Sequence, residues 1–105
     1  MKVEKFTEKA REAINRASEL AHEHHNGTIQ PEHLLAALLM DEEGVVPQIV
    51  QKVGGNLATA QRMVNDEVAR LPQAYGASEP SISPQLRNVL ERAWNEMSNF
   101  KDEYL

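Results

Sequence analysis

The side chains best suited to chemistry are four histidines, which all lie between residues 21 and 35 in the stretch AHEHHNGTIQPEHLL. Imidazoles beside carboxylates are the groups that zinc sites and acid–base sites use. Zinc proteases space two histidines four apart as H-E-x-x-H, and the run HEHHN lacks that spacing. His22 and His25 share one side of a helix, but no third ligand stands at a recognisable offset. We therefore expect no metal site, and we interpret the stretch as a helix end, a turn and a helix start.

Other catalytic patterns are missing from the sequence. It contains no phosphate-binding G-x-x-x-x-G-K-[ST], no nucleophile elbow G-x-S-x-G and no dinucleotide-binding G-x-G-x-x-G. Carboxylates such as Glu8 and Glu12 occupy polar helical positions, where solvation and support of the helix are their ordinary role. As an isolated chain, the protein is not expected to be an enzyme or to hold a cofactor.

Composition narrows the classes of partner. The chain has 105 residues, enough for one domain, and a formal net charge of -5, which argues against nucleic-acid binding because phosphates require a basic face. No apolar run approaches the roughly 20 residues that span a bilayer, so no membrane partner is expected. The chain has no cysteine, which suits the reducing cytoplasm.

The periodicity of apolar residues predicts helices from end to end. Apolar residues at i, i+3, i+4 and i+7 indicate a first helix over about residues 8–25. Prolines and cap residues predict later helices that begin near residues 31, 45, 57 and 84, separated by Asp41–Gly44, Gly54-Gly55 and Pro72. No strand pattern is present. We expect an all-α fold, a compact bundle of about five helices.

The predicted helix ends account for the histidines. Thr7 is expected to be an N-cap, and Gly27 is expected to close the first helix in a left-handed conformation. Three histidines then fall in its last turn, where imidazolium suits the negative end of the helix dipole: His22, His24 and His25. His33, in the first turn of the next helix, is expected to be buried or at an interface.

The most informative feature is an internal repeat. Residues 6–17 align with residues 82–93, with cap on cap, two arginines on two arginines and apolar residues at every core position. Without a gap, residues 27–29 fall on 103–105, so the second copy stops where the first continues into its next helix. We divide the chain into repeat one at about 1–71, a connector at 72–81 and an incomplete second repeat at 82–105.

The pattern FTEKA…PEHLLAALL, followed by a second helix that opens with S-P-x-L, resembles the Clp N-terminal repeat domain of the Clp AAA+ unfoldases and disaggregases. The resemblance covers nearly the whole chain. Within that family, the link Arg70-Leu71-Pro72-Gln73 and the Gly/Ser/Pro-rich connector after it are most similar to the ClpB disaggregases.

The resemblance implies a non-catalytic module that binds exposed apolar segments of unfolded or aggregated polypeptides and helps deliver them to an ATPase ring. It also implies a parent chain that forms a homohexamer in the cytoplasm, binds ATP and Mg²⁺ in its AAA+ domains and works with cooperating chaperones. The alternative is an adaptor-docking domain of a protease-partnered Clp unfoldase, which binds a folded partner instead.

The resemblance also implies substrate-binding residues. The polar positions of the family's groove fall on Thr7 and Asp102, and its apolar positions fall on the charged Arg92 and Glu96, with Ala93 and Met97 beside them. Simpler roles remain open, because Thr7 can act as an N-cap alone and Asp102 can organise the turn after the last helix. Two aromatic residues, Trp94 and Phe100, are candidates either for a contact with bound peptide or for the core. For Trp94 we favour a position in the core.

The incomplete repeat generates a first prediction. The last helix carries an apolar face whose partner helix in the repeat is missing, so part of that face should stay bare and recruit a neighbouring molecule. We expect the 105-residue chain to self-associate and to be less stable than a complete two-repeat domain. Sedimentation and urea unfolding of both proteins would test this. A strictly monomeric chain with the stability of the full domain would contradict it.

Overall fold

A computed structural model describes residues 7–76 and 79–104. This part of the chain forms five helices and two very short strands, so the all-α prediction is confirmed apart from the strands. In chain order the elements are α1 (Glu8–Glu23), β1 (Thr28–Ile29), α2 (Pro31–Met40), α3 (Val45–Lys52), α4 (Leu57–Ala69), β2 (Ser81–Ile82) and α5 (Pro84–Tyr104).

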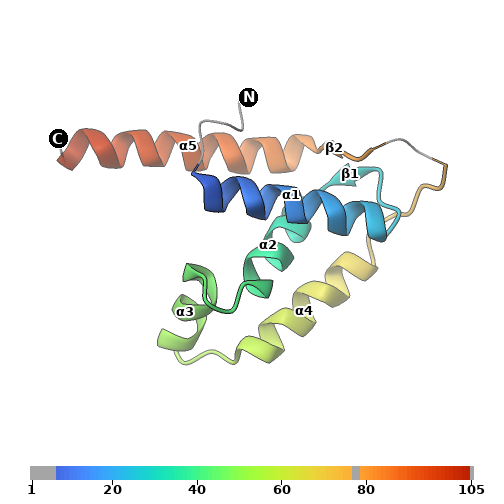
Figure 1. The fold of residues 1–105 in the computed structure, drawn as a ribbon, viewed down its shortest axis with the longest axis horizontal. Helices are drawn as coiled ribbons and strands as arrows, with labels where there is room; N and C mark the ends of the chain where they lie inside the picture. The colour runs from blue at the N-terminus through green and yellow to red at the C-terminus, as the bar shows by residue number, and fades with distance from the viewer. Residues whose placement is uncertain (1–6, 77–78, 105) are drawn as a thin grey trace.

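The helix α2 lies at the centre of the arrangement. It packs most extensively against α1 and then against α4, while α3 forms a short arm that contacts the ends of both α2 and α4 (Figure 1). The long helix α5 runs in the opposite direction to α1 (Figure 1). The two repeats therefore meet through α5, which packs against α2, and through the pairing of β1 with β2.

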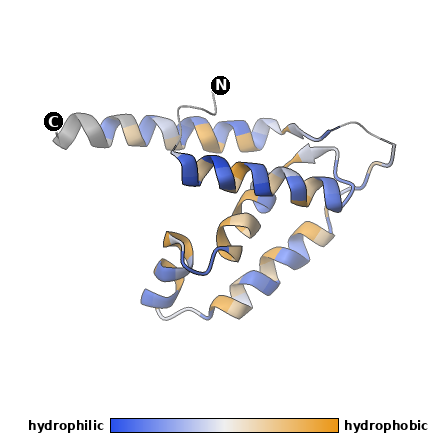
Figure 2. Ribbon diagram, viewed as in Figure 1, coloured by the Kyte–Doolittle hydropathy of each residue, from blue (hydrophilic) through white to orange (hydrophobic). Residues whose placement is uncertain are grey.

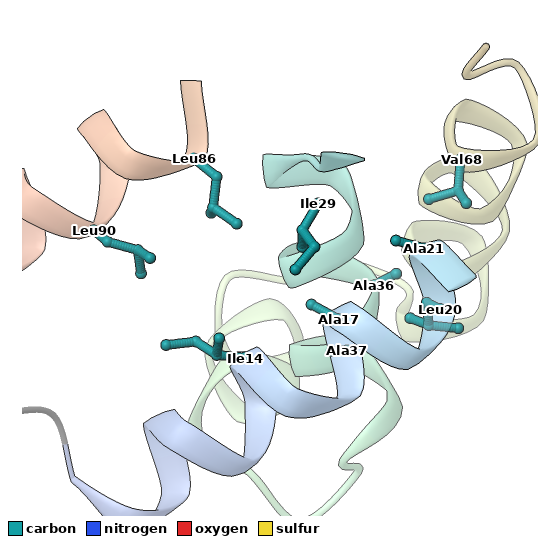
Figure 3. Close-up of a cluster of buried hydrophobic side chains, with 10 residues drawn as sticks. All are labelled: Ile14, Ala17, Leu20, Ala21, Ile29, Ala36, Ala37, Val68, Leu86 and Leu90. Carbon is teal, nitrogen blue, oxygen red and sulfur yellow. The ribbon is translucent and has the colours of Figure 1, made fainter. Parts of the chain in front are cut away.

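Small residues allow α1 and α2 to approach closely. Ala17 and Ala21 of α1 are completely buried, and Ala36 and Ala37 of α2 are nearly so. All four belong to one cluster of buried side chains (Figure 3). The distance between packed helices depends on the side chains at their contact, so alanines on both faces favour a short one. The sequence has few aromatic residues, and this close packing is how a modest core is filled.

The helix α5 shares this core through only part of its apolar face. Leu86 and Leu90 are buried, and Figure 3 shows Leu86 extending toward Ile29 while Leu90 lies on the side of Ile14. Two further residues pack partly buried against the cluster, Trp94 and Met97. Val89 and Ala93 on the same helix are exposed. Thus Trp94 lies against the core, whereas the side chain of Phe100 falls outside the described residues.

The sequence of α2 predicts a helix that is buried on all sides, but its burial is incomplete. Its sequence is apolar nearly all round, yet Leu35 and Met40 are exposed in the structure. Because α1 and α4 cover two sides of α2, its remaining side faces solvent over part of its length. Apolar composition alone does not reveal which side has no covering element.

A two-stranded parallel sheet is the element that the sequence did not predict. Thr28 pairs with Ser81 and Ile29 with Ile82. The backbone N–H of Ser83 donates to the carbonyl oxygen of Ile29 at 3.1 Å and extends the pairing to the start of α5. Two-residue strands are too short to show alternation, so periodicity could not find them. The sheet fixes the start of the second repeat beside the first α1–α2 turn.

The end of α1 also differs from the prediction, since the helix stops at Glu23 rather than near residue 25. The left-handed residue is His25, with φ of 57°, and Gly27 has no positive φ. The N–H of His25 donates to the carbonyl oxygen of His22, and that of Asn26 to Ala21, which is the Schellman arrangement. The His25 ring lies 4.5 Å from that of Tyr75, a contact that the sequence did not reveal.

A buried polar network holds this turn in place. His33 is fully buried, as predicted, and its Nδ1 accepts from the backbone N–H of Gln30 at 2.8 Å. Its other ring nitrogen, Nε2, therefore carries the proton and donates to Oδ1 of Asn26 at 2.8 Å. The Asn26 amide nitrogen donates in turn to the carbonyl oxygen of Pro72 at 2.9 Å. One chain of hydrogen bonds thus links α1, α2 and the connector after α4.

Burial lowers the pKa of His33, and this effect outweighs the nearby Glu32 carboxylate, which raises it. The unfolded chain then takes up a proton at its ordinary pKa while the folded chain stays neutral. We predict that the free energy of unfolding falls as the pH is lowered from 7 through 6 to 5.5. Urea unfolding at each pH measures this.

The matched variants separate His33 from the other histidines. The His33→Gln variant should be less stable at pH 7 and should lose much of this pH dependence. His22→Gln, a change at an exposed site in the last turn of α1, should keep the full dependence. Equal pH profiles for wild type and His33→Gln would show that His33 does not cause the effect.

The two repeat copies begin with equivalent caps in different surroundings. Thr7 Oγ1 accepts from the backbone N–H of Ala10 at 3.2 Å in an exposed position, which confirms the predicted cap. Ser83 Oγ accepts from the N–H of Leu86 at 3.0 Å, and Ser83 is buried. An alanine at residue 7 leaves an N–H that water can satisfy, whereas an alanine at residue 83 leaves a buried one.

We predict that Thr7→Ala lowers the stability by about 1 kcal/mol or less, and that Ser83→Ala lowers it by about twice as much. Urea unfolding of the two variants beside wild type measures the difference. A loss at Ser83 no larger than that at Thr7 would mean that water reaches the Leu86 amide.

Candidate functional site

The predicted substrate-binding residues gather around the middle of α5 and the start of α1. Ala93 is exposed on α5, and Met97, one turn later, is half-buried against the core. Val89, one turn earlier than Ala93, is 44% exposed. Residues four apart lie on the same side of a helix, so Val89, Ala93 and Met97 form a row along α5. We call this row the α5 strip.

Thr7 lies at the level of this strip. The two helices run in opposite directions (Figure 1), and Ile14 and Leu90 belong to the same buried cluster. Thr7 lies seven residues before Ile14, and Met97 lies seven after Leu90, so each is displaced by about 10 Å toward the same end of the pair. The helix geometry thus brings Thr7, which caps α1, and Met97 to one end of the α1–α5 pair.

The fourth predicted residue lies in a helix instead of a turn. The helix α5 continues to Tyr104, so the alternative in which Asp102 organises a turn after the last helix is wrong. Phe100 and Tyr104 continue the spacing of three and four beyond Met97, which is the sign in the sequence that the helix extends that far. The side chain of Asp102 lies outside the described residues.

Charged side chains flank the strip. Arg92 and Glu96 are exposed on α5, and they stand where the resemblance implied apolar groove positions. The strip is therefore a narrow apolar row beside charges. Such a surface suits weak contact with a polypeptide and offers no enclosed chamber for a small substrate.

The histidines do not form a metal centre in the described structure. Within residues 7–76 and 79–104, no three His, Cys, Asp or Glu side chains are grouped to hold an ion. His33 uses both ring nitrogens in the turn network, and His24 caps the end of α1. In the same described ranges, none of the helices combines the length and the apolar character needed to cross a bilayer.

A second surface feature, a groove, has no signature in the sequence. A groove of about 800 Å³ lies between the first half of α1 and the junction of α2 with α3. Its lining includes Ala10 and Ala13 from α1, Leu38 from α2 and Val45 from α3. Thr7, Ala93 and Met97 do not line it. The sequence could not reveal this groove, because it depends on how far the α2–α3 junction stands from α1.

Comparison with known proteins places the chain in a family. The model of the Clp repeat (R) N-terminal domain matches residues 5–105. A ClpB 2 chaperone of Synechocystis is 35% identical over 102 residues, which cover 96% of this chain and 12% of that relative. This chain therefore spans a small part of the length of such a curated relative.

Two solved structures share the fold. The Hsp104 N-terminal domain of Candida albicans superposes with a TM-score of 0.83 at 28% identity, over 91% of this chain and 63% of that one. A ClpV N-domain in complex with a VipB peptide gives a TM-score of 0.75 at 23% identity, over 87% of this chain and 54% of that one.

These matches confirm the resemblance that the PEHLLAALL motif and the repeated helix start suggested. The Synechocystis relative is a ClpB chaperone, and the two solved structures are the N-terminal domains of Hsp104 and ClpV. With the family model covering residues 5–105, the chain belongs to the Clp repeat (R) N-terminal domain family.

Proposed function

We propose that this chain is the substrate-engaging N-terminal module of a ClpB-type chaperone. In this proposal the α5 strip, with Thr7 beside it and Asp102 farther along α5, binds exposed apolar segments of unfolded or aggregated proteins. The module has no catalytic role of its own. It passes the bound segment to the ATPase ring of the parent chain.

One observation carries the proposal. Val89 and Ala93 are exposed on the helix whose neighbouring residues Leu86 and Leu90 form the core. The described part of the chain thus leaves an apolar row uncovered beside its own core, where another polypeptide can lie. That a ClpV N-domain of the same fold is found with a VipB peptide supports peptide binding by a domain of this shape.

The relatives extend the proposal to the parent chain. Since a similar curated protein is a ClpB chaperone of much greater length, we propose that ATP and Mg²⁺ bind in AAA+ domains of the parent. The parent would act as a homohexamer in the cytoplasm together with cooperating chaperones. A flexible tether between each module and the ring would let several modules bind one aggregate at once, which raises their effective concentration.

A second candidate function is docking of a folded adaptor, as in the protease-partnered Clp unfoldases. The charged residues Arg92 and Glu96 beside the strip favour it, because charge complementarity selects folded partners. A panel of folded adaptors titrated beside an unfolded protein separates the two functions. A chain that binds an adaptor tightly and ignores unfolded protein would support docking.

We predict that the chain binds reduced, carboxymethylated casein with a Kd on the order of micromolar or weaker, because a shallow surface retains little free energy after ordering a flexible ligand. Ala93→Lys should weaken this binding about fivefold or more, since it places a charge in the apolar row. Fluorescence anisotropy with labelled casein measures both affinities.

Asn88→Lys is the matched control, because it adds the same charge at an exposed site on another side of α5. It should leave the affinity nearly unchanged. If the two lysine variants bind casein equally well, the strip is not the binding surface. Measurable ATP hydrolysis by the 105-residue chain would contradict the non-catalytic role.

A further inference from the structure

The groove between α1 and the α2–α3 junction is a surface that the proposed function does not use. Its volume of about 800 Å³ lies in the range of well-formed binding clefts. Its apolar lining comes from three helices and includes Ala10, Ala13, Ala37, Leu38 and Val46. We propose that this groove is a second docking site, which binds a basic amphipathic helix of a partner protein.

The apolar surface continues from the groove along α3. Val45, which lines the groove, is 70% exposed, and Ile49 and Val53 at successive intervals of four are 53% and 78% exposed. The three form a ridge of about 12 Å on the outer side of α3 and its C-cap. Met40, at the end of α2, is also exposed and lines the groove. Valine and isoleucine together on an exposed ridge indicate a surface that packs against something.

The charges around the groove select a cationic occupant. The loop Asp41–Glu43 joins α2 to α3, and Figure 2 shows it as a hydrophilic segment after the apolar end of α2. Asp41 and Glu43 line the groove, as does Glu12 on α1. In the described structure the ion pairs are those of Arg16 with Glu19 and Glu23 and of Arg70 with Glu67. The carboxylates at the groove are therefore not neutralised within that structure.

The balance of charge at the groove is negative. Lys9 and Arg16 also line it, but Arg16 is engaged by two glutamates on its own helix. Among the described residues that line the groove, three carboxylates thus stand beside one cation without an ion pair, Lys9. An occupant with lysines or arginines beside its apolar face would gain complementary charge and a faster encounter.

The walls favour a helix over an extended segment. Apart from Glu43 in the loop between α2 and α3, the residues that line the groove belong to helices or their caps, whose backbone groups bond mostly within the helix. An extended peptide would find no strand edge to pair with, whereas a helix satisfies its own backbone. A partner helix also presents apolar side chains at spacings of three and four, which interdigitate with a ridge of spacing four on α3.

The test uses two synthetic peptides of 18 residues that differ only in charge. Both carry leucines at i, i+3, i+4 and i+7, and one has lysines and the other glutamates on the flanks. We expect the lysine peptide to bind the 105-residue chain at least tenfold more tightly than the glutamate peptide at low salt, with the difference shrinking as salt screens the charges. Equal affinities would overturn the proposal.

Variants then locate the site. The double variant Asp41→Lys, Glu43→Lys should bind the lysine peptide about tenfold more weakly than wild type. The double variant Val45→Ser, Ile49→Ser should bind both peptides more weakly. Their matched controls lie on exposed sites of α4, Asp66→Lys and Met63→Ser, and should bind as wild type. Amide NMR shifts caused by the peptide should fall on residues 9–16 and 37–53; shifts confined to α5 would overturn the proposal.

Casein binding by the same variants distinguishes the groove from the α5 strip. The groove variants should bind casein as wild type does, and Ala93→Lys should bind the lysine peptide as wild type does. Loss of both ligands in either set would show a single shared surface and would contradict a second site.

Discussion

The rest of the structure depends on the turn between α1 and α2. There, the buried imidazole of His33 donates a hydrogen bond to the side-chain oxygen of Asn26. The amide nitrogen of Asn26 donates to the carbonyl oxygen of Pro72. The backbone N–H of Ala74 donates to the carbonyl oxygen of His25 at 2.6 Å. The carbonyl oxygen of Ile29 accepts from the backbone N–H of Ser83, just before α5. Four separate segments meet at this one turn. Polar groups buried this completely tolerate few other geometries, so the turn sets the direction in which α2, the connector and α5 leave it.

The two candidate surfaces arise from one property of this architecture. α2 receives most of the packing, and the peripheral helices α3 and α5 bury only part of their apolar residues. On each of them a row of apolar residues spaced by four stays outside, beginning at Val45 on α3 and at Val89 on α5. The two rows differ in the charged side chains beside them. Carboxylates border the first, whereas charges of both signs flank the second, so the two surfaces suit different ligands.

Much of the fold could be predicted from the sequence, because helix starts have local chemical signatures. Thr7, Asn56 and Pro31 stand at the predicted starts, and the structure confirms them. The errors concern features that depend on distant residues. The two-residue strands exist because Ser81 reaches Thr28, and His25 rather than Gly27 takes the left-handed conformation in a turn that Tyr75 covers. Of the site, the sequence placed Ala93 on α5 and Thr7 at the start of α1, but the groove needs the spacing of α1 from α3, which no local pattern encodes.

The pairing of β1 with β2 has a consequence for the order in which the chain assembles. Thr28 and Ser81 are joined across about 50 intervening residues, while α1 and α2 meet through one short turn. Closing the longer loop costs more chain entropy, and its contacts are of high sequence separation. α5 is thus suited to be a separate cooperative unit, the last to dock and the first to detach while α1, α2 and α4 remain folded. Detachment would carry the surface on α5 away from the rest of the chain and would expose the side of the core that Leu86 and Leu90 cover.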